Sequence, residues 1–324
     1  MQKSRRLKAA LESLHSRYNR QEYLASDPLS LVLDHTSKRP KDVEVIALLC
    51  ALFAYGRVAS IKDFPVRLLQ WLGSKPHDAL IELHAKKRVL PGADLYYRFQ
   101  SCRDMETILY RLGAMLADSN RIPVPGNPES KGSRFLPLER YFASGVPEEI
   151  TSVSYDNGRR AGLPGIDAMI SFQSAFLSGI PESLQTDGIV HWIGRPEGKG
   201  ARKRLSMFLR WMVRKDYPDL GLYRCLDPAE LTVPLDVHLG RIARNLGFSA
   251  RKGADSTMAV EVSMALSGLW PADPLKYDFA LTRPGILGRC TGSFQESACP
   301  SCILRRVCAQ WANGPTTSSE TSVH

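Results

Sequence analysis

The sequence lacks an apolar run long enough to span a membrane. Its longest uninterrupted apolar segment, residues 45–55, has 11 residues, whereas a transmembrane helix needs about 20. The basic N-terminus has no apolar core and no small-residue cleavage site, so it does not fit a secretory signal. An early acidic residue and helical periodicity also argue against a transit peptide. We therefore expect a cytoplasmic protein with no membrane partner.

Long alternation of apolar and polar residues, the pattern of a half-buried strand, is also missing, and no repeat of fixed period is present. Apolar residues instead recur at three- to four-residue spacing, and residues 45–55 are apolar almost all round, as in a helix buried within a bundle. The chain is therefore predicted to be all-α. The amphipathic segments are residues 4–18, 66–72, 105–117, 166–177 and 205–213.

The hydrophobic and charged fractions of the sequence are typical of a globular protein. Hydrophobic residues make up 44% and charged residues 23% of the 324 residues, which excludes fibrous, mucin-like and wholly disordered chains. The formal charge is +10. A polyanion matches such a charge most simply, because each neutralised phosphate releases counterions. The alternative is that the charge only keeps the protein soluble.

Four of the seven cysteines lie in one segment, RCTGSFQESACPSCILRRVCAQW, with the spacing C-x8-C-x2-C-x5-C. Without an export signal a disulfide framework is not expected, and thiols this close can converge on one metal centre. A single C-x2-C pair after a lone cysteine favours a 4Fe-4S cluster; zinc is the alternative, and a segment without metal is the third possibility. The predicted ligands are Cys290, Cys299, Cys302 and Cys308.

Residues 198–215, GKGARKRLSMFLRWMVRK, contain seven cationic residues and no acidic one. Helical spacing places Lys203, Arg210 and Arg214 on one face and the apolar residues on another, so one side packs and the other is predicted to meet anions. The glycine-containing turn before the helix would leave backbone N–H groups free for phosphate. The alternative is a solvated basic face. Lys203, at the start of the helix, is a candidate amine nucleophile.

Further along, LTVPLDVHLGRIARNLGF places Asp236 between a proline and an amphipathic segment. The simplest interpretation of this aspartate is a helix N-cap. His238 is interpreted as a structural hydrogen-bonding residue rather than a catalyst.

The basic hairpin, the aspartate and the cysteine segment, in this order, resemble the helix-hairpin-helix DNA glycosylase superfamily, specifically its endonuclease III-like branch with a C-terminal iron-sulfur loop. The likeness extends from about Leu7 to Trp311. The phrases KRLSMFLRWMVRKD, VPLDVHLGRIARNLGF and DPLKYDFAL look closer still to an uncharacterised bacterial family of unknown function within that superfamily.

The resemblance implies a two-lobed helical fold that grips double-stranded DNA and flips a damaged base into a pocket between the lobes. Such a protein would be a DNA repair glycosylase of base excision, expected to be a monomer and to need no dinucleotide. The N-terminal helix, residues 1–30, would pack with a C-terminal lobe, 226–312. Residues 31–225 would form the other lobe, with a long loop at about 120–165 that contains one short helix near 136–142. The tail, 313–324, is expected to be disordered.

The resemblance also implies roles for single residues. Asp236 would orient a water or stabilise the oxocarbenium charge as the N-glycosidic bond breaks. In bifunctional members, which are also lyases, a hairpin lysine attacks the sugar; GKGARK departs from the usual L-P-G-x-G-x-K, so Arg202 and Lys203 both match that position, and we assign Lys203. Tyr55 matches a residue that wedges into the duplex, with core packing as the alternative. The other predicted DNA contacts are Lys199, Gly200, Arg202, Arg204, Arg210 and Arg214.

Two other functions stay open at this point. The chain could be a non-catalytic nucleic-acid-binding protein that retains the glycosylase fold. It could also be a zinc-stabilised RNA-binding or RNA-processing module.

Overall fold

The computed structural model describes residues 2–25, 27–86, 95–124, 135–146, 155–156, 159–160 and 163–312. Within these ranges the chain is almost entirely helical, which confirms the predicted all-α class. The exception is one antiparallel pair of two-residue strands, β1 (Tyr155–Asp156) and β2 (Arg159–Arg160).

The longer helices alternate with short 3-10 turns along the chain. The α-helices are α1 (Gln2–Tyr18), α2 (Leu29–Leu33), α3 (Pro40–Leu52), α4 (Val58–Leu72), α5 (Pro76–Lys86), α6 (Cys102–Asp118), α7 (Glu139–Ala143), α8 (Pro164–Ser178), α9 (Asp187–Ile193), α10 (Lys203–Val213), α11 (Val237–Leu246), α12 (Ser256–Ser267), α13 (Asp278–Ile286) and α14 (Ala309–Ala312). The 3-10 helices are η1 (Gln21–Tyr23), η2 (Ser119–Arg121), η3 (Glu182–Leu184), η4 (Pro228–Glu230), η5 (Cys299–Ser301) and η6 (Arg305–Val307).

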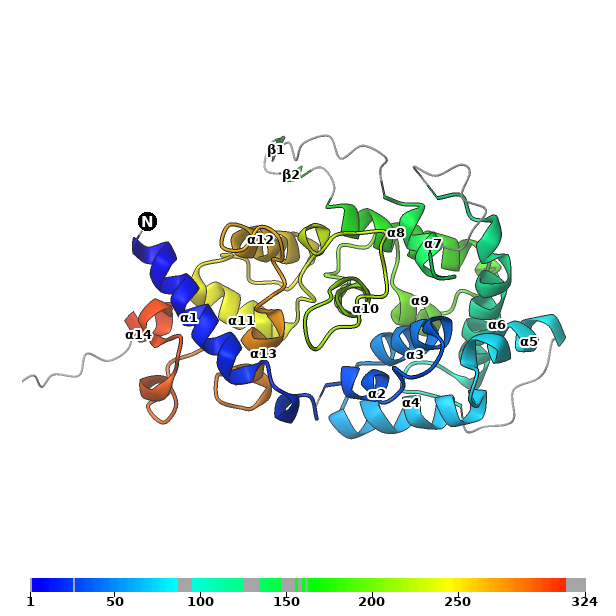
Figure 1. Ribbon diagram of the computed structural model, residues 1–324, viewed down its shortest axis with the longest axis horizontal. Helices are drawn as coiled ribbons and strands as arrows, with labels where there is room; N and C mark the ends of the chain where they lie inside the picture. Colours follow the sequence, from blue (N-terminus) through cyan, green and yellow to red (C-terminus); the bar gives the residue numbers. More distant parts are fainter. Residues whose placement is uncertain are drawn as a thin grey trace, which may run out of the picture.

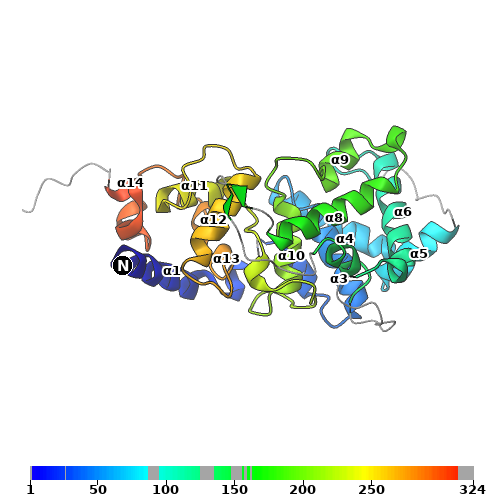
Figure 2. The same ribbon diagram turned by 90° about the horizontal axis from the view of Figure 1, so that it is seen from above.

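The helices gather at two ends of an elongated molecule (Figures 1 and 2). At one end α1 packs against α13 and η6, and α13 packs against α11. At the other end α3 packs against α2, α5 and α10, while α8 packs against α6, α7 and α10. We call α1 with α11–α14 the C-terminal lobe and α2–α9 the N-terminal lobe. Helix α10 lies between them and packs on the N-terminal lobe.

Helix α3 is the centre of the N-terminal lobe because it is buried along almost its whole length. It begins at Pro40, whose missing N–H costs nothing in the first turn, and Val45 to Leu52 are all buried. The helix ends at Leu52, three residues before the end predicted from the apolar run. The chain then turns at Gly56, which has a φ of +108°, and this turn carries Tyr55 out of the helix.

The short helix α7 lies where the sequence predicts one within the long loop. Its first turn is held by Glu44 of α3, whose Oε1 accepts hydrogen bonds from the N–H groups of Leu138 and Glu139, each at 3.0 Å. Much of the predicted loop, residues 125–134, 147–154, 157–158 and 161–162, lies outside the described residues, as does the predicted tail, 313–324.

None of the helices in the described ranges combines the length and the apolar character that crossing a membrane requires.

Candidate functional site

Lys203 and Asp236 lie side by side although they come from different helices. Lys203 is the first residue of α10, and Asp236 directly precedes α11. The Lys203 Nζ lies 3.1 Å from the Asp236 Oδ2, and the two side chains are 39% and 15% exposed, respectively. The structure thus brings the two predicted catalytic residues together in a place that solvent reaches.

The two oxygens of the Asp236 carboxylate have different partners. Oδ1 accepts a hydrogen bond from the Leu239 N–H at 2.8 Å and so caps the N-terminus of α11. Oδ2 faces the Lys203 ammonium. The cap fixes the rotamer of Asp236, so the second oxygen is held in place for a partner at the start of α10.

The loop between α9 and α10 positions Lys203. Gly194 ends α9 with a φ of +82°, and Arg202 precedes α10 in the left-handed region with a φ of +48°. Across the lobes, the Ser256 N–H donates to the Lys199 carbonyl at 2.9 Å, and Gly200 pairs with Asp255 at the start of α12. Lys199 and Gly200 are themselves exposed. The loop is therefore fixed at both of its ends and against the C-terminal lobe.

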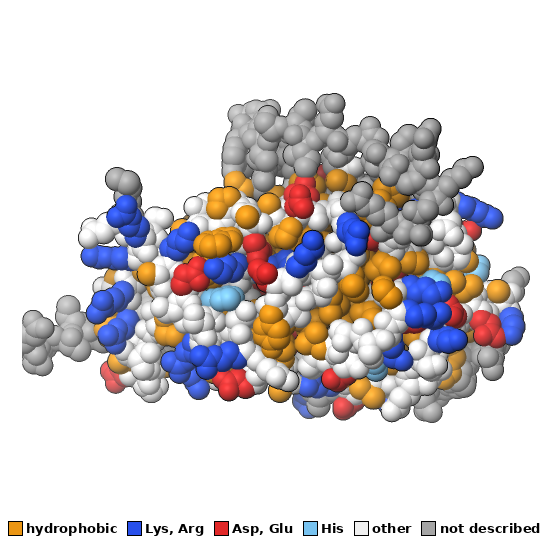
Figure 3. Space-filling model, viewed as in Figure 1, with side chains coloured by type: hydrophobic (Ala, Val, Ile, Leu, Met, Phe, Trp, Pro, Cys, Tyr) orange, Lys and Arg blue, Asp and Glu red, His pale blue; other side chains and the backbone are white. Residues whose placement is uncertain are grey.

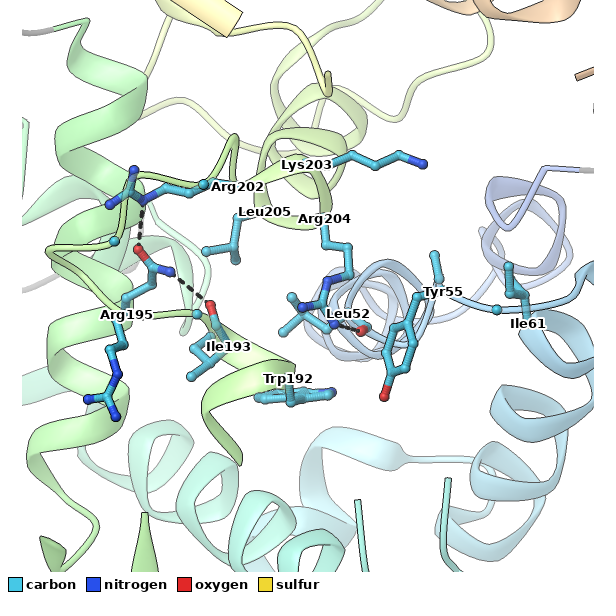
Figure 4. Close-up of a pocket in the computed structure, with 16 residues that line it drawn as sticks. Leu52, Tyr55, Ile61, Trp192, Ile193, Arg195, Arg202, Lys203, Arg204 and Leu205 are labelled. Atoms are coloured by element: carbon cyan, nitrogen blue, oxygen red, sulfur yellow. Dashed lines mark hydrogen bonds between the residues drawn. The ribbon is translucent and has the colours of Figure 1, made fainter. Parts of the chain in front are cut away.

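A cavity of about 450 Å³ opens beside this loop, between the end of α3, helix α9 and the start of α10 (Figure 4). No acidic residue is among the described residues that line it. Its cationic lining residues are Arg195, Arg202, Lys203 and Arg204. A pocket of this charge favours an anionic ligand.

Two of these arginines are already bound to protein groups. The Arg202 Nε donates to Gln173 Oε1 at 2.9 Å, and the Arg204 Nη1 donates to the Leu52 carbonyl at 2.9 Å; Figure 4 shows both bonds. The Arg204 guanidinium also lies 4.8 Å from the centre of the Tyr55 ring. Both side chains thus form part of the pocket wall, and their contact with DNA stays a prediction.

Trp192 lines the same pocket, and sequence reasoning missed it. Its side chain is fully buried, and its indole Nε1 has no hydrogen-bond partner among the described residues. A buried N–H without an acceptor is costly, but this nitrogen is itself closed off from the cavity, so it gives no evidence of a ligand. Nothing in the sequence around Trp192 distinguishes it from an ordinary core tryptophan.

The prediction that Arg210 and Arg214 contact DNA is wrong. Both are buried, and their partners are carboxylates of the protein itself: Arg210 Nη1 lies 2.7 Å from Asp278 Oδ2, and Arg214 Nη2 lies 2.7 Å from Asp273 Oδ2. Both arginines also bind Asp219, in the segment after α10. This face of α10 does meet anions, but the anions hold the two lobes together.

Tyr55, the predicted wedge, is half-buried at the rim of the pocket. Its hydroxyl donates to Gln100 Oε1, and its backbone carbonyl accepts from the Tyr97 hydroxyl at 2.6 Å. The ring contacts His191 at a centroid distance of 4.8 Å. Tyr55 is thus part of a packed aromatic group, and its role in DNA binding stays a prediction.

The Nδ1 atom of His238 does not make the hydrogen bond that the sequence-based interpretation expects. This atom is buried and has no hydrogen-bond partner in the described chain, and the backbone of Gly285 in α13 lies against it.

The four predicted cysteine ligands are half-buried, and none of them forms a disulfide. Burial raises the pKa of both Cys290 and Cys302, and the nearby thiols raise these two pKa values further, so the four sulfurs lie in one region. The Gln295 N–H donates to the Cys299 Sγ at 3.2 Å. Within the described ranges, however, no three His, Cys, Asp or Glu side chains are arranged as a metal site.

The donor chemistry of this region fits a soft metal. Four thiols suit an iron-sulfur cluster or structural zinc, and an N–H donated to sulfur stabilises a thiolate ligand. The identity of the bound group stays a prediction.

Comparison with known proteins gives one match. The model of a family described as "Protein of unknown function (DUF2400)" matches residues 27–287. No curated protein and no solved structure matches the chain. The matched region includes α10, Lys203 and Asp236, and ends before the first cysteine of the C-terminal segment. The chain belongs to this family of proteins of unknown function.

Proposed function

We propose that this protein is a DNA repair glycosylase, in which Asp236 promotes cleavage of the N-glycosidic bond of a damaged base. The observation that supports the proposal most is the 3.1 Å pair of Lys203 and Asp236 beside a cationic pocket. The resemblance to endonuclease III-like enzymes assigns catalysis to these same two residues. An amine and a carboxylate in contact are the groups that displacement of a base at C1′ requires.

We further propose that Lys203 gives the enzyme abasic-site lyase activity. Asp236 Oδ2 accepts a proton from the Lys203 ammonium, and the free amine attacks C1′ of the nucleotide. The C1′–N bond then breaks, and the base leaves with the electron pair and takes up the proton that Asp236 accepted. Opening of the C1′–O4′ bond passes the second amine proton to O4′ and leaves C1′ as a protonated Schiff base. Loss of a C2′ proton to water then breaks the C3′–O3′ bond, so that the 3′ phosphate leaves with the electron pair. Hydrolysis of the imine finally releases the Lys203 amine.

The pocket and the loop before α10 supply the binding part of the proposal. Exposed Lys199 and the N–H groups at the start of α10 would hold phosphates. The cavity of about 450 Å³ is within the usual size of a ligand site.

The four cysteines of the C-terminal segment would hold a 4Fe-4S cluster, with zinc as the alternative. When bound, the group would crosslink the chain between α13 and α14 and so stabilise the C-terminal lobe. Asp236 lies in that lobe, on α11, which packs against α13. We therefore expect the cluster to support the position of Asp236 and to take no part in the bond cleavage.

The second candidate is a non-catalytic DNA- or RNA-binding protein with the same fold. It is favoured by the fact that Asp236 caps α11, since a capping residue with a surface ion pair needs no catalytic role.

The test is base release from duplex DNA that carries oxidised, deaminated or alkylated bases, by the wild type and by Asp236→Asn. Asparagine keeps the cap but removes the charge, so we expect release to fall at least about 100-fold while DNA affinity is retained. Asp255→Asn is the matched control, because Asp255 caps α12 in the same way, through the Met258 N–H at 2.8 Å. Release that is equal in the three proteins would rule out a catalytic Asp236, and DNA binding without release of any base would favour the second candidate.

A further inference from the structure

A group of aromatic rings adjoins the pocket. Phe99 is 57% exposed, and its ring centroid lies 4.4 Å from that of His191. His191 in turn contacts Tyr55 at 4.8 Å, and Tyr55 lies over Phe99 at 6.3 Å with the rings nearly parallel. We call Tyr55, Phe99 and His191 the aromatic platform. Tyr96, in the same turn as Phe99, is 63% exposed.

The turn that carries Phe99 is rigid. Tyr97 and Gln100 exchange two backbone hydrogen bonds, of 3.0 and 2.9 Å, across it. Between them Arg98 has a φ of +54°, an unfavourable conformation for a residue with a side chain. The Gln100 Nε2 donates to the Gly188 carbonyl of α9 at 2.7 Å. The turn is thus fixed to the helix that carries His191, and the exposed rings need no ordering when a ligand binds.

Cations surround the platform. The Arg98 guanidinium lies 5.6 Å from the centre of the Phe99 ring, and that of Arg204 lies 4.8 Å from the centre of the Tyr55 ring. Burial, followed by the charges of Arg204 and Arg98, lowers the pKa of His191, so its ring is neutral at pH 7 and can stack. The platform continues into the cationic pocket, which Tyr55 and Arg204 both line.

We propose that the aromatic platform binds unpaired bases of a single-stranded DNA segment that adjoins the duplex held at the α9–α10 loop. Exposed rings interleaved with arginines are the means by which proteins hold single strands, because every base has a face that stacks and every phosphate a charge. Three rings packed on one another form a surface on which bases that are already unstacked can lie. A wedge residue, in contrast, is a single side chain that fills the gap left by one flipped base. This inference rests on the proposed function for the duplex part of the ligand.

The test measures affinity by fluorescence anisotropy for a blunt duplex, for the same duplex with a single-stranded oligo(dT) extension, and for oligo(dT) alone. We expect the extension to tighten binding by the wild type about tenfold, the effect of stacking one base. Phe99→Ala should lose that gain and bind the blunt duplex as the wild type does, whereas Phe99→Trp should retain it. Tyr217→Ala removes a tyrosine that is 47% exposed and outside the platform, and it should change nothing.

Three results would overturn the inference: an extension that adds no affinity, a Phe99→Ala variant that weakens blunt-duplex binding equally, and a stronger gain from an RNA extension than from DNA. Normal release of damaged bases from a blunt duplex in the same series would show that the proposed function survives. A different result would separate the two proposals. If oligo(dT) binding depends on Phe99 and the blunt duplex does not bind at all, the role of the platform is supported and the proposed function is refuted.

Discussion

At the scale of single residues, the position of Asp236 depends on its two carboxylate oxygens. One oxygen satisfies the N-terminus of α11 and the other meets Lys203. The capping role follows from the sequence alone, because an aspartate between a proline and an amphipathic segment is typical of an N-cap. The contact with Lys203 could be expected only from the family resemblance, since no local pattern specifies which distant side chain will approach the free oxygen.

Glu44 is a buried residue whose charge should affect stability. Its Oε1 accepts three hydrogen bonds, from two backbone N–H groups and the Tyr223 hydroxyl, but its Oε2 is buried without a partner in the described chain. Burial raises the pKa of Glu44 to about 8 from an ordinary value of 4.5. Between these two pH values the folded state holds a proton that the unfolded state has released, so stability falls as the pH rises from 4.5 to 8.

We therefore expect Glu44→Gln to remove much of this pH dependence and to be more stable than the wild type at pH 8, by on the order of a few kcal/mol. Chemical denaturation at pH 5, 6, 7 and 8 measures the slope. Parallel curves for the two proteins would show that Glu44 carries the same charge in both states.

At the scale of elements, α10 is the helix on which sequence reasoning was partly wrong. The pattern correctly gives a helix with cationic and apolar faces, but a helical face does not reveal what lies opposite it. Asp219 follows α10 in an irregular segment, and Asp278 begins α13. Together with Arg210 these carboxylates form a buried ion-pair network. A single sequence cannot reveal this network, because its members come from three segments: α10, the segment after it, and α13.

Arg210→Ala should therefore destabilise the protein by about 3–5 kcal/mol, since it leaves Asp278 buried without its cation and Asp219 paired with Arg214 alone. Differential scanning calorimetry with chemical denaturation measures the loss. The DNA affinity of the folded variant should be unchanged. A stable variant with weakened DNA binding would instead support the sequence-based prediction of a phosphate contact.

The proposed cluster should stabilise the segment of residues 290–308. Because a bound metal contributes its binding free energy to folding, Cys302→Ser should lose the metal and melt at lower temperature, while any folded fraction keeps the contact between Lys203 and Asp236. Metal analysis, visible absorbance and thermal melting measure these effects, with Cys102→Ser, an exposed cysteine of α6, as the control. Unchanged metal content and melting temperature in Cys302→Ser would refute the cluster.

At the scale of the whole molecule, the all-helical class was predictable because helical periodicity recurs in long segments that lack strand alternation. Helical periodicity could not distinguish the aromatic residues that line the pocket from those of the core. Trp211 of α10 and Trp192 of α9, for example, are both fully buried, yet Trp192 lines the pocket and Trp211 does not. Which residues line the pocket depends on how α3, α9 and α10 pack against one another. Local sequence patterns do not give this tertiary arrangement.

The net charge of +10 also acts at this scale. Exposed cations near the pocket include Arg98, Arg195 and Lys199, and Lys and Arg side chains also gather over α1 and α14 at one end of the face in Figure 3. Three phosphate contacts predict about a 40-fold loss of DNA affinity between about 50 mM and 200 mM salt. Lys199→Ala should lower the slope of log affinity against log salt concentration by about the value of one phosphate contact. An affinity that does not change with salt would show that the loop does not contact DNA phosphates.

Borohydride trapping on duplex DNA with one abasic site tests the roles of Lys203 and Asp236 most directly. We expect a covalent complex with the wild type, its loss in Lys203→Ala, and its retention in Lys199→Ala, which removes a lysine of the loop before α10. A complex that persists in Lys203→Ala, or the absence of any complex with the wild type, would contradict the assignment of Lys203 and Asp236 as the catalytic pair of a lyase.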